Sequence, residues 1–405
     1  MDSAKRPKSQ RLRTIGRRAL LRGLGIGVAV APAVLLRRHR LFAQSSTQYS
    51  SRAVTLMRES IVIDLLNQFM RPHRNSMPPK IEQWLSRPET FTDAEAAVFV
   101  ESGIRVFALG GGSGAPIFNY NNLISGSGGR LLRIDSISDI ERAQRERKIG
   151  IMLTIQDSPA PFSPEQLPGV FKGGLRIAQL TSNDTNKSGS GFLADSDDGM
   201  TDYGRSVMKR MEEVGVGVDV SHCGDRTTLD ALEAATKPVL FTHANCRALV
   251  PGHMRLKTDE MLVKMAKTGG MMGMTFVRNF IRDHDPTTLD HLIDHFDYAR
   301  RLIGIQHLAI GSDLDVLGYS FTLPEDATVP YAGPKGKNAE RYHWRSDPVG
   351  LWYTDTIMEL AHSKRMFDLT DGLIRRGYTD EDIKLILGGN AMRVLGNIWP
   401  KAASN

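Results

Sequence analysis

Short apolar runs alternate with longer amphipathic stretches along most of the chain. The runs are rich in Val, Ile, Leu and Met and show little polar alternation, which is typical of parallel strands buried on both faces. They cover residues 61–66, 104–110, 150–156, 174–180, 216–222, 239–243, 270–276 and 307–313. Helical patterns lie between several of them, over residues 137–147, 201–213, 226–235, 258–267 and 287–302. This α/β alternation predicts a (β/α)8 TIM barrel, with a doubly wound sheet as the alternative because strand number does not show closure.

Three of the apolar runs end on a residue that can bind a metal ion or carry a proton. The run 216–222 ends at His222, the run 239–243 at His243, and the run 307–313 at Asp313. The carboxyl ends of parallel barrel strands meet at one mouth, where barrel enzymes place their active sites. We therefore expect two imidazoles and a carboxylate to converge there.

Length and charge fit one large globular domain, or two small ones, behind a basic segment. The chain has 405 residues, of which 41% are hydrophobic, and a formal net charge of +7. Eleven Lys and Arg residues precede residue 44 against a single Asp, so the remainder carries a formal charge of −3. A mildly acidic folded part gives no support for a nucleic-acid partner.

The basic segment has the pattern of an export signal. Arg17 and Arg18 are followed by Ala-Leu-Leu and by a weakly apolar stretch, residues 23–36, that is too short to span a bilayer. This pattern predicts a twin-arginine signal over residues 1–43, a barrel domain over residues 44–405, and a periplasmic or other extracytoplasmic location reached through the twin-arginine export machinery. A disordered basic tail is the alternative.

Other segments leave their roles open. Residues 110–129 are rich in Gly, Ser and Asn but lack the lysine of a phosphate-binding loop, so we expect a loop over the barrel mouth. Residues 319–348 are expected to form a long loop after the last strand. Cys223 and Cys246 each lie close to a histidine of interest. They can pair as a disulfide, approach a metal ion or simply be buried.

Four segments resemble the membrane (renal) dipeptidase family, peptidase family M19. They are GRSVMKRMEEVGVGVDVSH at 204–222, PVLFTHANCRAL at 238–249, IGSDLD at 310–315 and RGYTDEDIKLILGGNAMRVL at 376–395. The resemblance extends from about residue 54 to residue 397. It implies a (β/α)8 barrel with two zinc ions bridged by a glutamate, dipeptide substrates and a homodimer.

The resemblance assigns roles to five residues. It implies that His222 and His243 bind zinc, that Asp313 transfers protons and that Arg255 receives the substrate carboxylate. Ser182 stands where the family has a histidine that contacts substrate.

The sequence departs from the family at the other metal ligands. Leu66 and Gln68 replace a His-x-Asp pair, and Gln156 replaces the bridging glutamate. Leucine has no lone pair and glutamine has no charge, so we expect one zinc ion and not two. The ligand that completes the site is sought at Gln156, Asp157, Asp313 or a cysteine.

Some family site residues are retained and others are replaced, and three functions are compatible with this combination. The first is an exported metal-dependent hydrolase of dipeptides or similar small amides, in which metal-activated water attacks a carbonyl. The second is a different small-molecule reaction, with Ser182, Asp184 and residues 342–345 forming a new pocket. The third is a catalytically inactive periplasmic binding or assembly protein.

Overall fold

The computed structural model describes residues 49–69, 79–110, 119–156, 163–284, 286–318 and 357–400. They belong to one compact unit, Tyr49–Asn405. The predicted export signal with Arg17 and Arg18, the candidate ligand Asp157 and residues 342–345 lie outside the described residues. None of the helices in the described ranges is both long and apolar enough to cross a membrane.

A closed ring of parallel strands forms the centre of this unit, as the sequence predicts. Neighbours pair in the order β1-β2-β4-β5-β6-β7-β8-β9, and β9 pairs with β1 to close the ring. The eight strands are β1 (Ile63–Asn67), β2 (Val106–Leu109), β4 (Ile149–Ile155), β5 (Leu175–Gln179), β6 (Gly217–Asp219), β7 (Leu240–Ala244), β8 (Met271–Met274) and β9 (Leu308–Ile310). Each of them falls on one of the eight predicted runs, and the (β/α)8 prediction is confirmed.

One additional strand was not predicted. Strand β3 (Leu131–Arg133) pairs in parallel with the first half of β4, where Leu131 lies opposite Ile149. Strand β5 pairs with the second half of β4, where Leu153 lies opposite Leu175. Strand β3 therefore lies outside the eight-strand closure.

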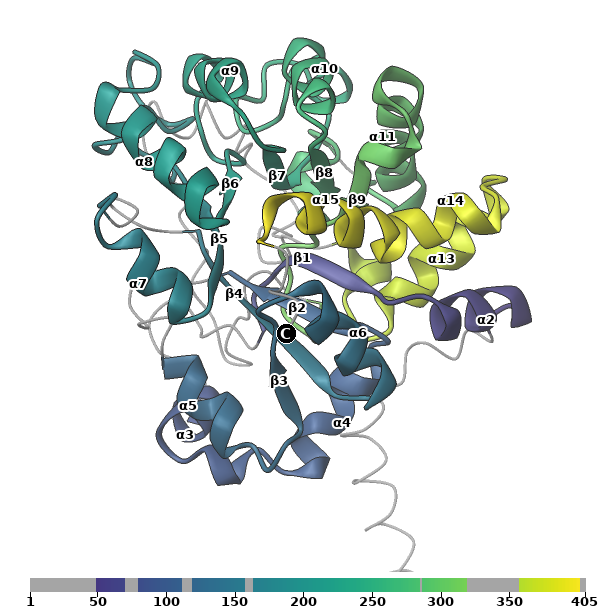
Figure 1. Ribbon diagram of the computed structural model, residues 1–405. Helices are drawn as coiled ribbons and strands as arrows, with labels where there is room; N and C mark the ends of the chain where they lie inside the picture. Colours follow the sequence, from purple (N-terminus) through teal and green to yellow (C-terminus); the bar gives the residue numbers. More distant parts are fainter. Residues whose placement is uncertain are drawn as a thin grey trace, which may run out of the picture. The chain divides into compact units, whose positions relative to one another are not determined.

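Helices cover the outside of the barrel, as the ribbon in Figure 1 shows for α8, α9, α10 and α11. The helices are α2 (Ser51–Glu59), α3 (Pro79–Ser86), α4 (Asp93–Glu101), α5 (Asn119–Gly126), α6 (Ile137–Arg145), α7 (Leu167–Lys172), α8 (Asp202–Val214), α9 (Asp225–Ala234), α10 (Asp259–Lys267), α11 (Leu289–Ile303), α13 (Arg365–Arg375), α14 (Asp380–Lys384) and α15 (Asn390–Ile398). Local signals set their ends. The Thr201 side chain accepts a hydrogen bond from the Gly204 amide at the start of α8, and Gly215 ends that helix with a φ of 90°.

The expected loop over residues 110–129 is partly wrong. Helix α5 covers Asn119–Gly126, and β3 follows it directly. The helix buries Leu123, which gives this stretch an apolar anchor that its Gly and Ser content conceals. Residues 111–118 lie outside the described ranges.

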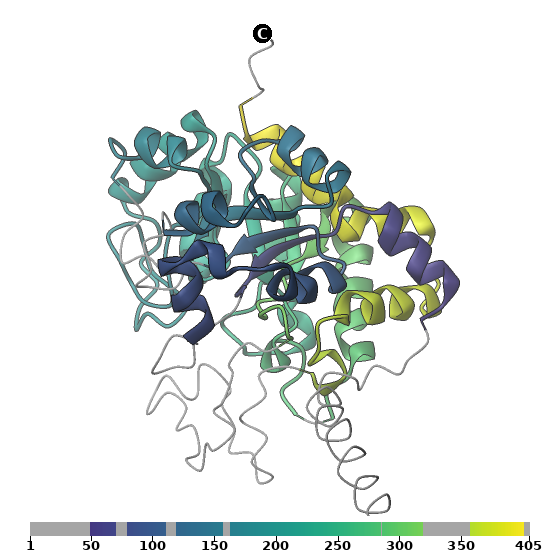
Figure 2. The same cartoon turned by 90° about the horizontal axis from the view of Figure 1, so that it is seen from below.

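The two ends of the described chain pack side by side. Figures 1 and 2 both show α2 next to α13 and α14. The Arg52 Nε donates to Asp380 Oδ1 at 2.7 Å, and the Ser50 hydroxyl donates to Asp371 Oδ1 at 2.6 Å. These contacts fix the carboxyl-terminal helices against the start of the barrel.

The barrel interior is narrow at its carboxyl end because two glycines face the end of β7. A Cβ atom on Gly311 would lie 1.8 Å from the Thr242 carbonyl oxygen, and one on Gly273 would lie 2.2 Å from the same atom. Only glycine permits this approach. The approach also brings the segment after β9, which carries Asp313, next to the backbone of His243.

Candidate active site

Two histidine side chains meet at the carboxyl ends of β6 and β7. Their Nε2 atoms lie 2.7 Å apart. His243 is fully buried within β7, and His222, a partly buried residue, follows β6 in a tight turn. The two imidazoles therefore meet at the barrel mouth, whereas Asp313, the third expected member, lies against Gln68.

Hydrogen bonds to the far side of each ring determine which nitrogen carries the proton. His222 Nδ1 lies 2.6 Å from Asn183 Oδ1, which can only accept, so this nitrogen donates. Thr242 Oγ1 donates to Asp219 at 2.6 Å and lies 2.8 Å from His243 Nδ1, which therefore donates to Thr242. Both Nε2 atoms consequently direct their lone pairs toward each other, as in imidazoles that bind a metal ion.

The buried carboxylate of Asp219 organises both strand ends. It accepts hydrogen bonds from the amide and hydroxyl of Ser221, at 3.0 and 2.6 Å, and from the amide of Thr242 at 3.1 Å. Burial raises its pKa, and these donors offset part of that effect. One side chain thus fixes the residue before His222 and the residue before His243.

Two buried cations hold the same strand ends through main-chain carbonyls. Arg255 donates from Nη1 to Ser221 at 2.6 Å and from Nη2 to His243 at 2.8 Å. Lys257, two residues further on, donates to the carbonyl of Val220 at 2.9 Å and to that of Cys223 at 3.1 Å. The structure therefore gives Arg255 a role in shaping the site, and its binding of a substrate carboxylate stays a prediction.

The histidines are held neutral. Burial lowers the pKa of both His222 and His243 far below the ordinary value for imidazole, and the nearby Arg255 and Lys257 lower it further. Neutral imidazoles keep their Nε2 lone pairs available at pH 7.

The buried ammonium of Lys257 makes stability depend on pH. Burial lowers its pKa to about 7 in the folded chain, whereas an unfolded lysine titrates near 10.5. The folded state therefore releases this proton first, so the free energy of unfolding should rise by about 2 kcal/mol between pH 7 and pH 9. Denaturant titrations of wild type and Lys257→Met should show this rise in the wild type only. An equal rise in both would contradict the assignment.

Two glutamines lie at the site, one against the imidazoles and one against the carboxylate of Asp313. Gln156, after β4, places its Nε2 at 3.1 Å from the Nε2 of each histidine, so its two amide hydrogens can donate to both lone pairs. Gln68, after β1, donates from Nε2 to Asp313 Oδ1 at 2.5 Å. Gly110 touches both amides, because a Cβ there would lie 3.1 Å from Gln156 and from Gln68. The five side chains thus form one cluster at the barrel mouth.

Asp313 is held in an unusual backbone conformation. Its φ is 59°, in the left-handed region that residues with a Cβ rarely adopt. Its amide donates to the carbonyl oxygen of Leu66 at 2.9 Å. Non-glycine residues in this region cost about 1–3 kcal/mol and often lie at functional sites.

The segment after β5 contains both an expected and an unexpected site residue. Ser182 is partly buried there, beside Asn183. Asn183 was not predicted, although its place in the polar segment that follows β5 was the available signal. A Cβ on Gly191 would lie 2.4 Å from the carbonyl oxygen of Ser182 and 2.3 Å from that of Asn183, so the segment folds tightly back on itself.

Both cysteines are free and buried. Cys223 Sγ accepts a hydrogen bond from Thr181 at 3.1 Å, and burial raises the pKa of its thiol to about 11. Cys246 Sγ lies 3.7 Å from the carbonyl oxygen of His295, and burial raises its pKa as well. Protonated, buried thiols of this kind are packing residues and poor metal ligands.

Comparison with known proteins identifies the family. The profile of the membrane dipeptidases, peptidase family M19, matches residues 118–328 and 349–404. The chain belongs to the membrane dipeptidase family. An uncharacterised protein from the pqqA 5' region of Klebsiella pneumoniae is 33% identical over 217 residues, which are 50% of this chain and 78% of that protein. The dipeptidase tcpJ of Claviceps purpurea is 26% identical over 208 residues, 51% of this chain and 40% of that protein.

Solved structures of other proteins share the barrel fold of this chain. An amidohydrolase from Pseudomonas aeruginosa superposes with a TM-score of 0.66 at 22% identity, covering 86% of this chain and 99% of the other. A Rhodobacter sphaeroides metallopeptidase liganded with a phosphinate mimic of the dipeptide L-Ala-D-Ala gives 0.64 at 16% identity, covering 84% and 100%. At these identities the likeness shows the fold. Family membership supports hydrolysis as the class of reaction.

The side chains do not match the bridged metal pair implied for membrane dipeptidases. The two imidazoles are suitable zinc ligands. The described residues contain no group of three or more His, Cys, Asp or Glu side chains placed to hold a metal ion. Leu66 is buried and offers no lone pair, while Gln68 and Gln156 are uncharged. A carboxylate-bridged pair does not fit these residues.

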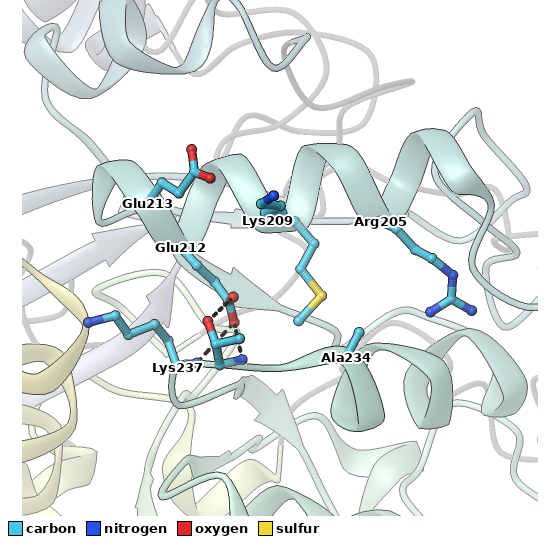
Figure 3. Close-up of a pocket in the computed structure, with 8 residues that line it drawn as sticks. Arg205, Lys209, Glu212, Glu213, Ala234 and Lys237 are labelled. Atoms are coloured by element: carbon cyan, nitrogen blue, oxygen red, sulfur yellow. Dashed lines mark hydrogen bonds between the residues drawn. The ribbon is translucent and has the colours of Figure 1, made fainter.

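A separate hollow of about 450 Å³ lies between α8 and α9 (Figure 3). It lies at the helix ends that lead into β6 and β7, which is the opposite end of the barrel from the histidines. Glu212 is oriented toward the segment after α9, where it accepts hydrogen bonds from the amide and hydroxyl of Thr236 and the amide of Lys237. Residues at this end of a barrel usually serve stability, and Glu212 joins α8 to the start of β7.

Proposed function

We propose that this protein hydrolyses dipeptides or similar small amides with one divalent, zinc-like ion held by His222 and His243. The convergence of their two Nε2 lone pairs carries the proposal. Asn183 and Thr242 fix both tautomers, and such partners of metal-binding histidines orient the ring and raise its basicity. Family membership supports the hydrolytic class.

Gln156 lies against the Nε2 atoms of both histidines. Its amide nitrogen faces the imidazoles, and a half-turn of the carboxamide would present Oε1 at the same place. The amide can therefore orient either an ion or a substrate carbonyl without adding charge. When bound, the ion would act as a Lewis acid toward the scissile carbonyl.

Asp313 is the proposed proton carrier. Gln68 fixes its Oδ1, which orients the carboxylate toward the cluster. It would take a proton from the attacking water and deliver it to the leaving amine. Ser182 and Arg255 are proposed to lie on the side that receives the substrate.

The proposed location is extracytoplasmic, through the twin-arginine signal with Arg17 and Arg18. This pathway carries folded proteins, so an ion loaded before export would remain in place. A homodimer is proposed from the family resemblance.

Metal analysis combined with turnover tests the function. We expect about one equivalent of a divalent ion per chain, because two imidazoles supply one set of ligands. Chelation should abolish cleavage of a panel of dipeptides, dehydropeptides and N-acyl amino acids, and zinc should restore it. Two equivalents per chain, or turnover that survives complete removal of metal, would contradict the proposal.

A binding function is the second candidate, and the neutral glutamines favour it. Gln68 and Gln156 reduce the negative charge available to hold a metal ion at the mouth. Calorimetry with the same amide panel separates the two. Binding without product formation, with metal present, would support a binding protein.

A further inference from the structure

We infer that Asp64 and Arg365 form a buried clamp that positions Asp313 for proton transfer. The inference deepens the proposed function, because it rests on Asp313 as the proton carrier. Neither residue belongs to the cluster at the mouth. Asp64 lies within β1, Arg365 begins α13, and both side chains are fully buried.

The carboxylate of Asp64 holds the two residues that precede Asp313 and Gln68. Its Oδ1 accepts from the Ser312 amide at 2.8 Å, and its Oδ2 accepts from the Ser312 hydroxyl at 2.5 Å. Its Oδ2 also accepts from Asn67 Nδ2 at 2.9 Å. Ser312 precedes Asp313, and Asn67 precedes Gln68, the residue that donates to Asp313. A single carboxylate therefore fixes both partners of that hydrogen bond.

Arg365 closes the clamp from the opposite side. Its Nη2 lies 3.9 Å from Asp64 Oδ2 and donates to the Ser312 hydroxyl at 3.4 Å. Its Nη1 donates to the Val316 carbonyl oxygen at 3.2 Å. The guanidinium thus binds the chain on both sides of Asp313, at Ser312 and at Val316.

The main chain completes the arrangement. The Asp313 amide donates to Leu66, and the Gln68 amide donates to the Leu314 carbonyl oxygen at 3.0 Å. These bonds join the segments after β1 and β9 at the point where Asp313 has its left-handed φ. Such a conformation persists only where surrounding contacts determine it.

The burial of the Asp64–Arg365 pair indicates that its role is to orient the neighbouring backbone. An ion pair at this depth adds little net stability, because desolvation costs about as much as the attraction returns. Its directional bonds, in contrast, set where the neighbouring backbone lies. The Asp64–Arg365 pair determines the conformation from Ser312 to Val316, and Asp313 lies within it.

A double-mutant cycle tests the clamp. Asp64→Asn is expected to lower kcat about tenfold or more, with KM and metal content unchanged. In the Asp313→Asn background the same change should cause no further loss, because a positioning residue acts only through Asp313. A merely structural role would reduce both backgrounds by the same factor, and that result would overturn the inference. Arg365→Lys should retain more of kcat than Arg365→Met.

A measurement without substrate keeps this inference separate from the proposed function. Hydrogen–deuterium exchange in a peptide covering residues 308–318 should accelerate at least tenfold in Asp64→Asn, while a peptide covering residues 149–155 stays protected. If wild type cleaves no amide, this result alone decides whether the clamp holds Asp313. Unchanged exchange over residues 308–318 in both Asp64→Asn and Arg365→Lys would overturn it.

Discussion

The variants His222→Ala and His243→Ala are each expected to lose the metal ion and, with it, hydrolysis of every amide that the wild-type chain cleaves. Each imidazole supplies one of only two nitrogen lone pairs in the cluster. Loss of a residue that only orients a metal ligand lowers metal affinity by about 10–100-fold. Loss of the ligand itself should therefore lower it by more than about 100-fold. Elemental analysis after gel filtration, together with zinc titration, measures the loss.

Matched variants make the histidine result specific. Asn183→Ala removes the hydrogen bond to His222 Nδ1, and Thr242→Val removes the bond to His243 Nδ1 together with the Thr242–Asp219 bond. Both keep the two imidazoles, so they should weaken metal binding by about 10–100-fold without abolishing it. His291→Ala removes an imidazole that caps the start of α11 through Thr288 and makes no contact with the cluster, so it should leave the metal content unchanged. Full metal content in both His222→Ala and His243→Ala, with unchanged folding, would remove the basis of the metal proposal.

Asp313→Asn is expected to lower kcat by about 10²–10⁴, the usual contribution of a general acid or base. Asparagine keeps the shape of the side chain and can still accept from Gln68, but it cannot take up the transferred proton. Metal content should stay unchanged, because Asp313 lies against Gln68 and not against the imidazoles. Steady-state kinetics with parallel metal analysis measures both quantities.

The control for Asp313→Asn is another carboxylate near the mouth. Asp198, in the segment between β5 and α8, is exposed, so Asp198→Asn changes the charge of the region without touching the cluster. It should keep kcat within about twofold, since exposed charges interact weakly. Equal losses in both variants would assign the effect to charge alone.

The barrel was predictable because its strands are buried on both faces and therefore read as continuous apolar runs. Strand β3 was missed because its apolar residues, Leu131 and Leu132, are flanked by arginines on both sides. The equally short strands β6 and β9 lie within longer apolar runs. One geometric rule, that parallel barrel strands end at a common mouth, was enough to select His222, His243 and Asp313.

The buried residues that support the site could not be predicted from the sequence. Asp64 contacts Ser312 across 248 positions of the chain, and Arg365 reaches it from a helix. Such pairs depend on loop conformation, which a run of residue types does not specify. Arg255 shows the converse: the resemblance implies a contact with substrate, whereas its described bonds are to main-chain carbonyls.

The contacts of Arg255 and Lys257 with main-chain carbonyls imply a pocket whose shape does not depend on the metal ion bound in it. These cations tie the two histidine-bearing turns together through protein atoms alone. The apo protein should therefore retain the spacing of its imidazoles and exchange one divalent ion for another without unfolding. The ion that the proposed site would carry would then be set by supply and by the Irving–Williams order of affinities, and not by refolding around a preferred metal.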